Sequence, residues 1–164
     1  MKRGAAVCFA ISLALAAGAA GAGTVVLEQA QWWRQPIASP LAHVPSTRPP
    51  PADATWVDWA VPADRFSIDG PGAAAKGVSG PSVSWVRWRF ALPPRAAGEP
   101  LALYVPVWAV EHYEWLLNGV AVAASLGPEA RFRRTWNRPL LLDLPEALLR
   151  PGDNELLLAT YPYR

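Results

Sequence analysis

Hydrophobic and polar residues alternate with a period of two along the second half of the chain, as they do in β-strands that have one buried face. The segment 84–92 shows the pattern best: one side carries Val86, Trp88, Phe90 and Leu92, and the other carries Trp85, Arg87, Arg89 and Ala91. In the segment 101–108, the inward side is expected to carry Leu101, Leu103, Val105 and Val107, with Tyr104 and Trp108 on the opposite side. Both segments are therefore predicted to be strands that pack one face on a core.

Turn residues mark the remaining strands. Segments 112–117 and 120–124 flank Asn118-Gly119, which is the strongest short signal for a β-hairpin. Segments 138–143 and 154–161 flank one short helical turn, expected near 145–149. Because prolines are frequent and the period is two, the sequence predicts an all-β protein, an antiparallel β-sandwich.

The N-terminal part of the chain predicts export. Lys2 and Arg3 precede an apolar stretch, and Ala20-Gly21-Ala22 satisfies the small-residue rule for a cleavage site. We therefore expect a signal peptide over residues 1–22 and a periplasmic or other extracytoplasmic location. The alternative is that this stretch is retained as an uncleaved membrane anchor.

The rest of the chain divides into two expected parts. Residues 23–54 are expected to contain a short strand at 24–30 and then a proline-rich linker. Residues 55–164 are expected to form the sandwich, beginning with a strand at 55–61.

Composition narrows the possible partners. The 164 residues suffice for one domain with a hydrophobic core, and the formal net charge of +2 comes from 15 basic and 13 acidic residues. Lys2 and Arg3 are two of the basic residues, so the chain after residue 22 is neutral and no nucleic-acid partner is expected. The one cysteine, Cys8, lies in the export signal, so the exported part can form neither a disulfide nor a thiolate metal site.

Four motifs, taken in order, resemble the galactose-binding-like jelly roll. They are Trp56-Val57-Asp58-Trp59-Ala60-Val61-Pro62, Trp85-Val86-Arg87-Trp88-Arg89-Phe90, Glu114-Trp115-Leu116-Leu117-Asn118-Gly119 and Leu148-Leu149-Arg150-Pro151-Gly152-Asp153-Asn154-Glu155-Leu156. Two families share this order: the extracytoplasmic sensor domain of bacterial seven-transmembrane signalling proteins, and the N-terminal sugar-binding domain of family 2 glycoside hydrolases. Where the families have tyrosine in a Trp-Tyr-Arg strand, this chain has Val86. The jelly roll is also expected to be truncated at its C-terminal end, because the chain stops at Arg164 where one more strand is expected.

The resemblance implies two functions, and a third stays open. The leading interpretation is a non-catalytic sensor module that binds an unknown small molecule or sugar and precedes a membrane bundle with a histidine kinase or diguanylate cyclase. The second is a carbohydrate-binding module of a secreted glycosidase whose chemistry resides in a separate barrel. The third is a structural or subunit-contact domain.

No residue pattern indicates catalysis by this chain. Glycoside hydrolysis requires two carboxylates about 5 to 10 Å apart around a cleft, whereas Glu111 and Glu114 flank a strand edge and the other acidic candidates fall in turns. A Gly-x-Ser-x-Gly nucleophile elbow is absent. His43 and His112 lie too far apart in sequence for a metal-ligand pattern. We therefore expect no catalytic residues, no metal site and no cofactor.

The nine tryptophans are the unusual feature of the composition. Trp56 or Trp59, together with Trp88 and Trp115, fit inward positions. An aromatic ring beside guanidinium and carboxylate groups is how a sandwich binds a sugar ring or an anionic metabolite. On that basis the candidate ligand-binding residues are Trp85, Arg87, Arg89, Trp108, Glu111, His112, Arg133 and Trp136. The alternative is that the second sheet covers these residues, and the structural-domain interpretation predicts that Trp85 and Trp108 are buried.

Overall fold

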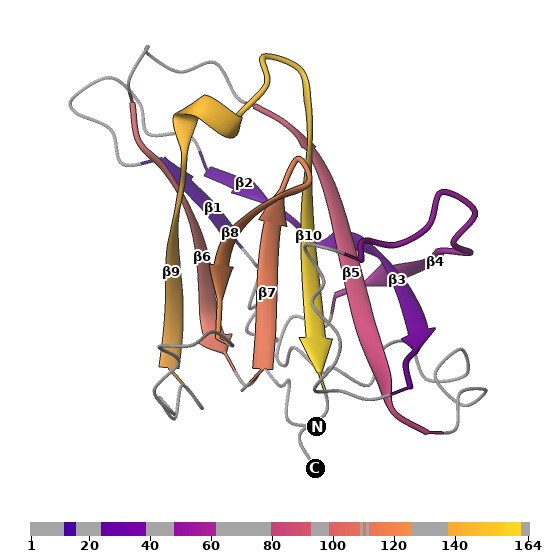
Figure 1. The fold of residues 1–164 in the computed structure, drawn as a ribbon. Coiled ribbons are helices and arrows are strands. Elements are labelled where there is room, and N and C mark those ends of the chain that lie inside the picture. Colours follow the sequence, from indigo (N-terminus) through magenta and orange to yellow (C-terminus); the bar gives the residue numbers. More distant parts are fainter. Residues whose placement is uncertain are drawn as a thin grey trace, which may run out of the picture.

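Two antiparallel sheets make up the structure, which confirms the predicted all-β sandwich (Figure 1). The computed structural model describes residues 12–15, 24–38, 48–61, 80–92, 99–108, 110, 112–125 and 138–161. The larger sheet has the order β4 (Val57–Ala60), β3 (Gln29–Pro36), β5 (Ser82–Ala91), β10 (Asp153–Tyr161), β7 (His112–Leu117) and β8 (Val120–Ala124). The smaller sheet has the order β2 (Thr24–Val26), β1 (Ser12–Leu15), β6 (Leu101–Trp108) and β9 (Arg138–Leu144). The expected helical turn is a single 3-10 turn, η4 (Glu146–Leu148).

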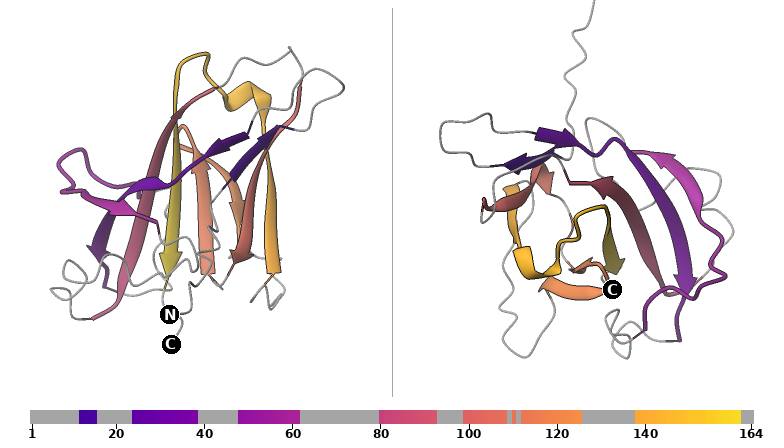
Figure 2. Two further views of the ribbon diagram at one scale, coloured as in Figure 1. Left: turned by 180° about the vertical axis from the view of Figure 1, so that it is seen from behind. Right: turned by 90° about the horizontal axis from the view of Figure 1, so that it is seen from above.

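The main core lies between the two sheets, which face each other in the views of Figure 2. On β5, the alternation places Val86, Trp88 and Phe90 in this core, as the sequence predicts. The antiparallel register sets Trp88 beside Leu156 of β10, and Leu156 in turn lies beside Leu117 of β7. Burial of this apolar face is the main source of stability, since the described part of the chain contains no cysteine for a disulfide.

A row of packed aromatic rings crosses this core. Trp88 stacks on Trp115 with ring centroids 5.7 Å apart, and Trp115 lies 5.7 Å from Trp108. Trp108 then meets Tyr113 edge to face at 4.9 Å. The row therefore joins β5 and β7 of the larger sheet to β6 of the smaller one. Aromatic pairs of this kind stabilise a fold by more than the burial of their surface area alone.

Trp108 lies in the core, although the alternation along 101–108 predicts it on the opposite face. Its side chain is only 1% exposed. The register between β6 and β9 shifts between Val105 and Trp108, which is a β-bulge. Because a bulge inserts one extra residue, it reverses the alternation beyond it and turns Trp108 inward. The expected outward position of Trp108 is therefore wrong.

The hairpin and the η4 loop are joined by asparagine side chains. Asn118 and Gly119 have φ angles of 49° and 86°, the conformation of a two-residue hairpin turn, which confirms the β7–β8 hairpin. The Asn118 side-chain amide donates to the carbonyl of Leu148 (2.6 Å) and to Oδ1 of Asn154 (2.9 Å), while its Oδ1 accepts the backbone N–H of Glu155 (2.9 Å). We call these three bonds the Asn118 clamp. Two of the motifs that carry the family resemblance thus contact each other.

Strand β3 was not expected in full. The sequence pattern predicts a strand at 24–30 and a proline-rich linker at 35–54, whereas Gln29–Pro36 is one strand paired with both β4 and β5. Pro36 is its last residue, a position where the missing N–H costs little. The larger sheet therefore includes a strand that precedes residue 55, the expected start of the sandwich. The other expected domain boundaries stay predictions.

Strand β1 falls within the segment expected to be a signal peptide. Ser12–Leu15 pairs with β2 and with β6. Cleavage of residues 1–22 stays a prediction. The proposed membrane anchor at residues 4–23 falls mostly outside the described residues, and within the described ranges no helix is long and apolar enough to cross a membrane.

Candidate functional site

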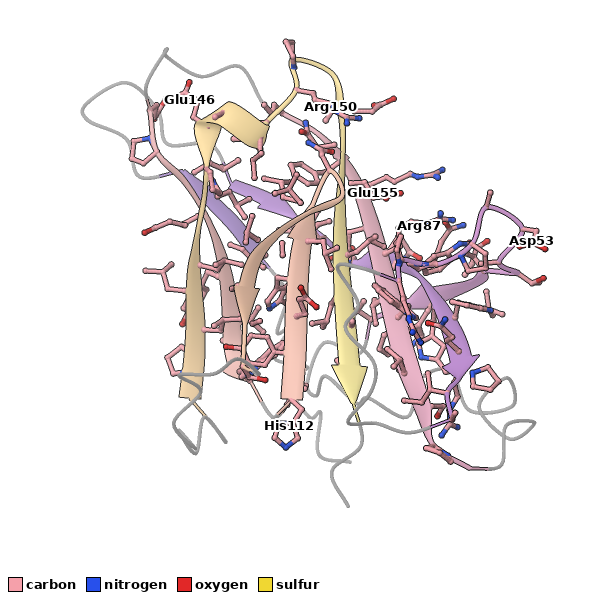
Figure 3. All side chains as sticks on the ribbon, viewed as in Figure 1. Asp53, Arg87, His112, Glu146, Arg150 and Glu155 are labelled. Carbon is pink, nitrogen blue, oxygen red and sulfur yellow. The ribbon has the colours of Figure 1, made fainter. Side chains whose placement is uncertain are left out.

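The candidate site lies on the outer face of the larger sheet, the face turned away from the main core. The sheet register sets Gln31 of β3 opposite Arg87 of β5, and Arg89 of β5 opposite Glu155 of β10. Figure 3 shows Arg87 and Glu155 on these neighbouring strands. We define the outer-face cluster as the polar and aromatic side chains that meet here: Gln31, Trp33, Trp56, Arg87, Arg89 and Glu155.

Arg87 is the centre of the outer-face cluster. Its guanidinium carbon lies 4.0 Å from the ring centroid of Trp56, which is a cation–π contact. Its Nε donates to Oε1 of Gln31 at 3.0 Å, and its Nη2 donates to the same oxygen. Gln31 Nε2 donates in turn to Oδ1 of Asp58 at 3.0 Å, which fixes the orientation of the Gln31 amide. Arg87 is therefore held in one plane over the Trp56 ring.

The carboxylate of Glu155 lies near the guanidinium groups of two arginines. Its Oε2 lies 3.9 Å from Nη1 of Arg87 and 3.7 Å from Nε of Arg89. Both separations exceed a hydrogen bond, so these contacts are electrostatic and leave guanidinium N–H groups able to bond an oxygen of a ligand. Burial lowers the pKa of Arg87, and Arg89 lowers it further, while Glu155 raises it. Arginine nevertheless remains protonated in proteins, so both guanidinium groups carry charge.

The aromatic members rest on a second apolar cluster. Trp33 and Trp56 are half-buried, with ring centroids 6.2 Å apart and planes at 49°. Together with Ile37 they pack against a fully or nearly fully buried set consisting of Val83, Trp85, Leu116, Leu157 and Ala159. The two partly accessible rings are thus supported from below by a rigid apolar base.

Two of the predicted site residues belong to the outer-face cluster. Arg87 and Arg89 lie there, and the side chain of Arg87 is 15% exposed while that of Arg89 is 65% exposed. Whether they bind a ligand stays a prediction. Glu111, Arg133 and Trp136 lie outside the described residues, so the structure does not place them.

Trp85, Trp108 and His112 do not belong to the outer-face cluster. Trp85 shares the strand face of Arg87, but it is fully buried and its indole N–H donates to Gln35 at 2.9 Å. Trp108 belongs to the main core, as described above. His112 is half-buried at the start of β7, opposite Tyr161 and far along the strands from Glu155 (Figure 3). In this conformation neither tryptophan presents its ring to solvent.

Sequence reasoning missed four members of the outer-face cluster: Gln31, Trp33, Trp56 and Glu155. The signal for the first two was available, because Gln31, Trp33 and Gln35 alternate with Ala30, Trp32 and Arg34. The predicted strand nevertheless ended at Ala30, and the prolines at 36 and beyond indicated a linker from Gln35. Trp56 was expected to be inward as an alternative to Trp59, and the structure places Trp59 in the core and Trp56 outside it.

The arrangement suits binding through aromatic and polar contacts. Within the described ranges, no group of three or more histidine, cysteine, aspartate or glutamate side chains is placed to hold a metal ion. The outer-face cluster instead offers an aromatic surface, guanidinium donors and one carboxylate acceptor.

Comparisons with known proteins identify the fold. No protein-family model matches the chain, and no curated protein matches its sequence. A β-glucuronidase from an uncultured Clostridium species is similar in structure, with a TM-score of 0.52 and 20% identity over 80% of this chain and 20% of the enzyme. The β-glucuronidase of Bifidobacterium dentium, solved with coumarin-3-O-glucuronide, has a TM-score of 0.53 and 18% identity over 97% of this chain and 21% of the enzyme. The chain therefore spans about a fifth of the length of these enzymes, and the likeness at such identities is one of fold.

Proposed function

We propose that this chain is a non-catalytic β-sandwich module of the carbohydrate-binding type, and that the outer-face cluster is its ligand site. The observation that carries the proposal is the juxtaposition of Trp33 and Trp56 with Arg87, Arg89 and Glu155 on one face of the sheet. The apolar C–H face of a sugar stacks on an aromatic ring, while its hydroxyl groups require donors and acceptors around that ring. The outer-face cluster offers both.

The structural neighbours support the carbohydrate interpretation over the signalling one. They are β-glucuronidases, which agrees with the resemblance to the sugar-binding domain of family 2 glycoside hydrolases. Because the chain spans about a fifth of those enzymes, their hydrolytic activity is not transferred to it. The sensor interpretation, with a membrane bundle and a kinase or cyclase downstream, stays a prediction. Apolar segments of about 20 residues in the reading frame beyond Arg164 would support it, since that length crosses a bilayer.

A fluorescence titration tests the proposal. Neutral and acidic mono- and disaccharides are added to the protein while tryptophan emission is followed, and a saturable change is expected for at least one of them. Trp56→Ala should weaken that binding about tenfold or more, because the substitution removes part of the aromatic surface and the ring that positions Arg87.

Tyr104→Ala is the matched control for this titration. Tyr104 is also an exposed aromatic residue, but it lies on β6 of the smaller sheet. Its substitution should leave the affinity within a factor of about two. Equal losses from Trp56→Ala and Tyr104→Ala, with both variants folded, would place the sugar elsewhere on the molecule.

A second candidate is a structural or subunit-contact domain, and the burial of Trp85 and Trp108 favours it. In that case the outer-face cluster would contact another protein domain, since tryptophan and arginine are enriched where such contacts are strongest. A flat titration with an unchanged melting temperature across the whole saccharide panel would support this candidate against the first.

A further inference from the structure

The turn between β7 and β8 contains a reactive dipeptide. Asn118 is the only one of the three asparagines in the chain that is followed by glycine. Gly119 has no Cβ to shield its backbone nitrogen, and nothing lies within 4 Å of the position that a Cβ would take there. The backbone nitrogen of Gly119 is therefore sterically free to attack the side-chain amide of Asn118.

We propose that Asn118 is a deamidation site that is blocked in the folded protein and becomes reactive only when the Asn118 clamp opens. In the reaction, the backbone nitrogen of Gly119 forms a bond to Cγ of Asn118 and loses its proton. The Cγ–Nδ2 bond breaks, and Nδ2 leaves as ammonia with that proton. Water then opens the resulting succinimide at one of its two carbonyl carbons, which yields aspartate or isoaspartate.

The Asn118 clamp opposes this step at each atom of the side-chain amide. The leaving group Nδ2 donates to the carbonyl oxygen of Leu148 at 2.6 Å and to Oδ1 of Asn154 at 2.9 Å. Oδ1 accepts the N–H of Glu155 at 2.9 Å. Cγ must rotate toward the nitrogen of Gly119 for the ring to close, and that rotation breaks all three bonds. Attack therefore requires prior local opening of the turn.

The segment that carries the partner groups is itself held in place. Asn154 Oδ1 also accepts the N–H of Arg150 at 2.8 Å, and Asn154 Nδ2 donates to the carbonyl oxygens of Arg150 (3.0 Å) and Gly152 (2.9 Å). The backbone N–H of Asn118 donates to the carbonyl oxygen of Glu155 at 2.8 Å. The β7–β8 turn lies beside this segment in Figure 1, between η4 and β10. The partners of the Asn118 side chain are thus held by bonds that do not involve that side chain.

The modified residue cannot restore the clamp. An aspartate at position 118 has no N–H₂ group, so its carboxylate would face two acceptors, the oxygens of Leu148 and Asn154. Isoaspartate also adds a methylene group to the main chain of a two-residue turn. Deamidation of Asn118 therefore permanently weakens the contact between the β7–β8 hairpin and the η4 loop.

The test compares rates of deamidation at mildly alkaline pH in the full chain. Peptide mapping by mass spectrometry follows the conversion of amide to acid at Asn118 in the native protein and in the urea-unfolded protein. The unfolded chain should react at least about tenfold faster. Asn137 and Asn154, which are followed by arginine and glutamate, serve as internal controls and should react slowly when unfolded.

The variant Asn154→Ala tests the clamp itself. It removes one acceptor of Asn118 and loosens the loop that holds the others, so deamidation of the folded variant should accelerate about fivefold or more, the effect of losing one ordinary hydrogen bond. Equal rates in native and unfolded wild type would overturn the proposal. A folded Asn154→Ala protein that reacts at the wild-type rate would overturn it as well.

A measurement on the wild-type protein covers the case in which Asn154→Ala fails to fold. The Glu155 N–H donates to Asn118 Oδ1, so its hydrogen exchange reports opening of the same bond. Low concentrations of urea should raise the exchange rate of Glu155 and the deamidation rate of Asn118 in parallel. Faster exchange with unchanged deamidation would contradict gating by the clamp.

Discussion

Arg87 and Trp88 are neighbours on β5, yet they belong to two regions of opposite character. Trp88 points into the main core, where it is fully buried and stacks on Trp115. Arg87 points to the outer face, where it covers the ring of Trp56 and bonds to Gln31. Both regions are rich in tryptophan. In the core, Trp88, Trp108 and Trp115 are buried and form ring contacts, whereas on the outer face Trp33 and Trp56 remain partly accessible and Trp56 contacts a guanidinium group.

The difference shows that tryptophan content alone does not indicate a binding surface. Of the eight tryptophans within the described ranges, Trp32, Trp59, Trp88, Trp108 and Trp115 belong to the main core, Trp85 belongs to the base of the outer face, and Trp33 and Trp56 are half-buried. The main core tryptophans explain stability. Trp33 and Trp56 are partly exposed, and Arg87 lies over the Trp56 ring, so the proposed function depends on these two tryptophans.

The largest effect expected is that of Trp88→Ala. The substitution removes the ring at the β5 end of the aromatic row and leaves a cavity that a close-packed core cannot fill, so the free energy of unfolding should fall by about 3 to 5 kcal/mol. Urea denaturation followed by far-UV circular dichroism measures it. A loss below about 1 kcal/mol would mean that Trp88 is not in a tightly packed core.

Arg87→Ala should have an intermediate effect. The substitution removes a cation–π contact and leaves the Gln31 oxygen without its donors, which together should cost about 1 to 2 kcal/mol. The Arg87 side chain is only 15% exposed, so its removal should cost more than that of an ordinary surface residue. The same denaturation assay, with Arg87→Lys as the control, separates charge from the planar fork that bonds Gln31. If Arg87→Ala lowered the free energy of unfolding as much as Trp88→Ala does, the two faces of β5 would not differ in their contribution to stability.

Arg89→Ala should have the smallest effect on stability. Its side chain is 65% exposed and its contact with Glu155 is 3.7 Å long, so the change in the free energy of unfolding should stay below about 0.5 kcal/mol. If the outer-face cluster binds a sugar, however, Arg89→Ala should weaken that binding severalfold in the fluorescence titration. A variant that loses stability but keeps full affinity would show that Arg89 is a structural residue.

Much of the fold was predictable because it follows from local patterns. The period-two alternation of 84–92 assigns both faces of β5 correctly, and the Asn118-Gly119 turn requires the positive φ angles that the structure has. The outward assignment of Trp108 was wrong because a bulge leaves no clear mark in the alternation. The strand β3 was only partly predicted because the prolines beyond it resemble those of a linker, while its pairing with β5 depends on residues about 50 positions away.

The sequence by itself determined that this chain is an antiparallel β-sandwich, because side-chain alternation and turn residues act over a few positions. The tertiary structure decided which tryptophans are core and which are partly exposed, because that depends on which strand lies beside which. It also brought Gln31 and Trp56 to Arg87, and Asn118 to Asn154, through the register of strands that are distant in sequence. Burial and hydrogen bonding are properties of that packed arrangement, and they gave the same residue types a structural role on one face and a proposed binding role on the other.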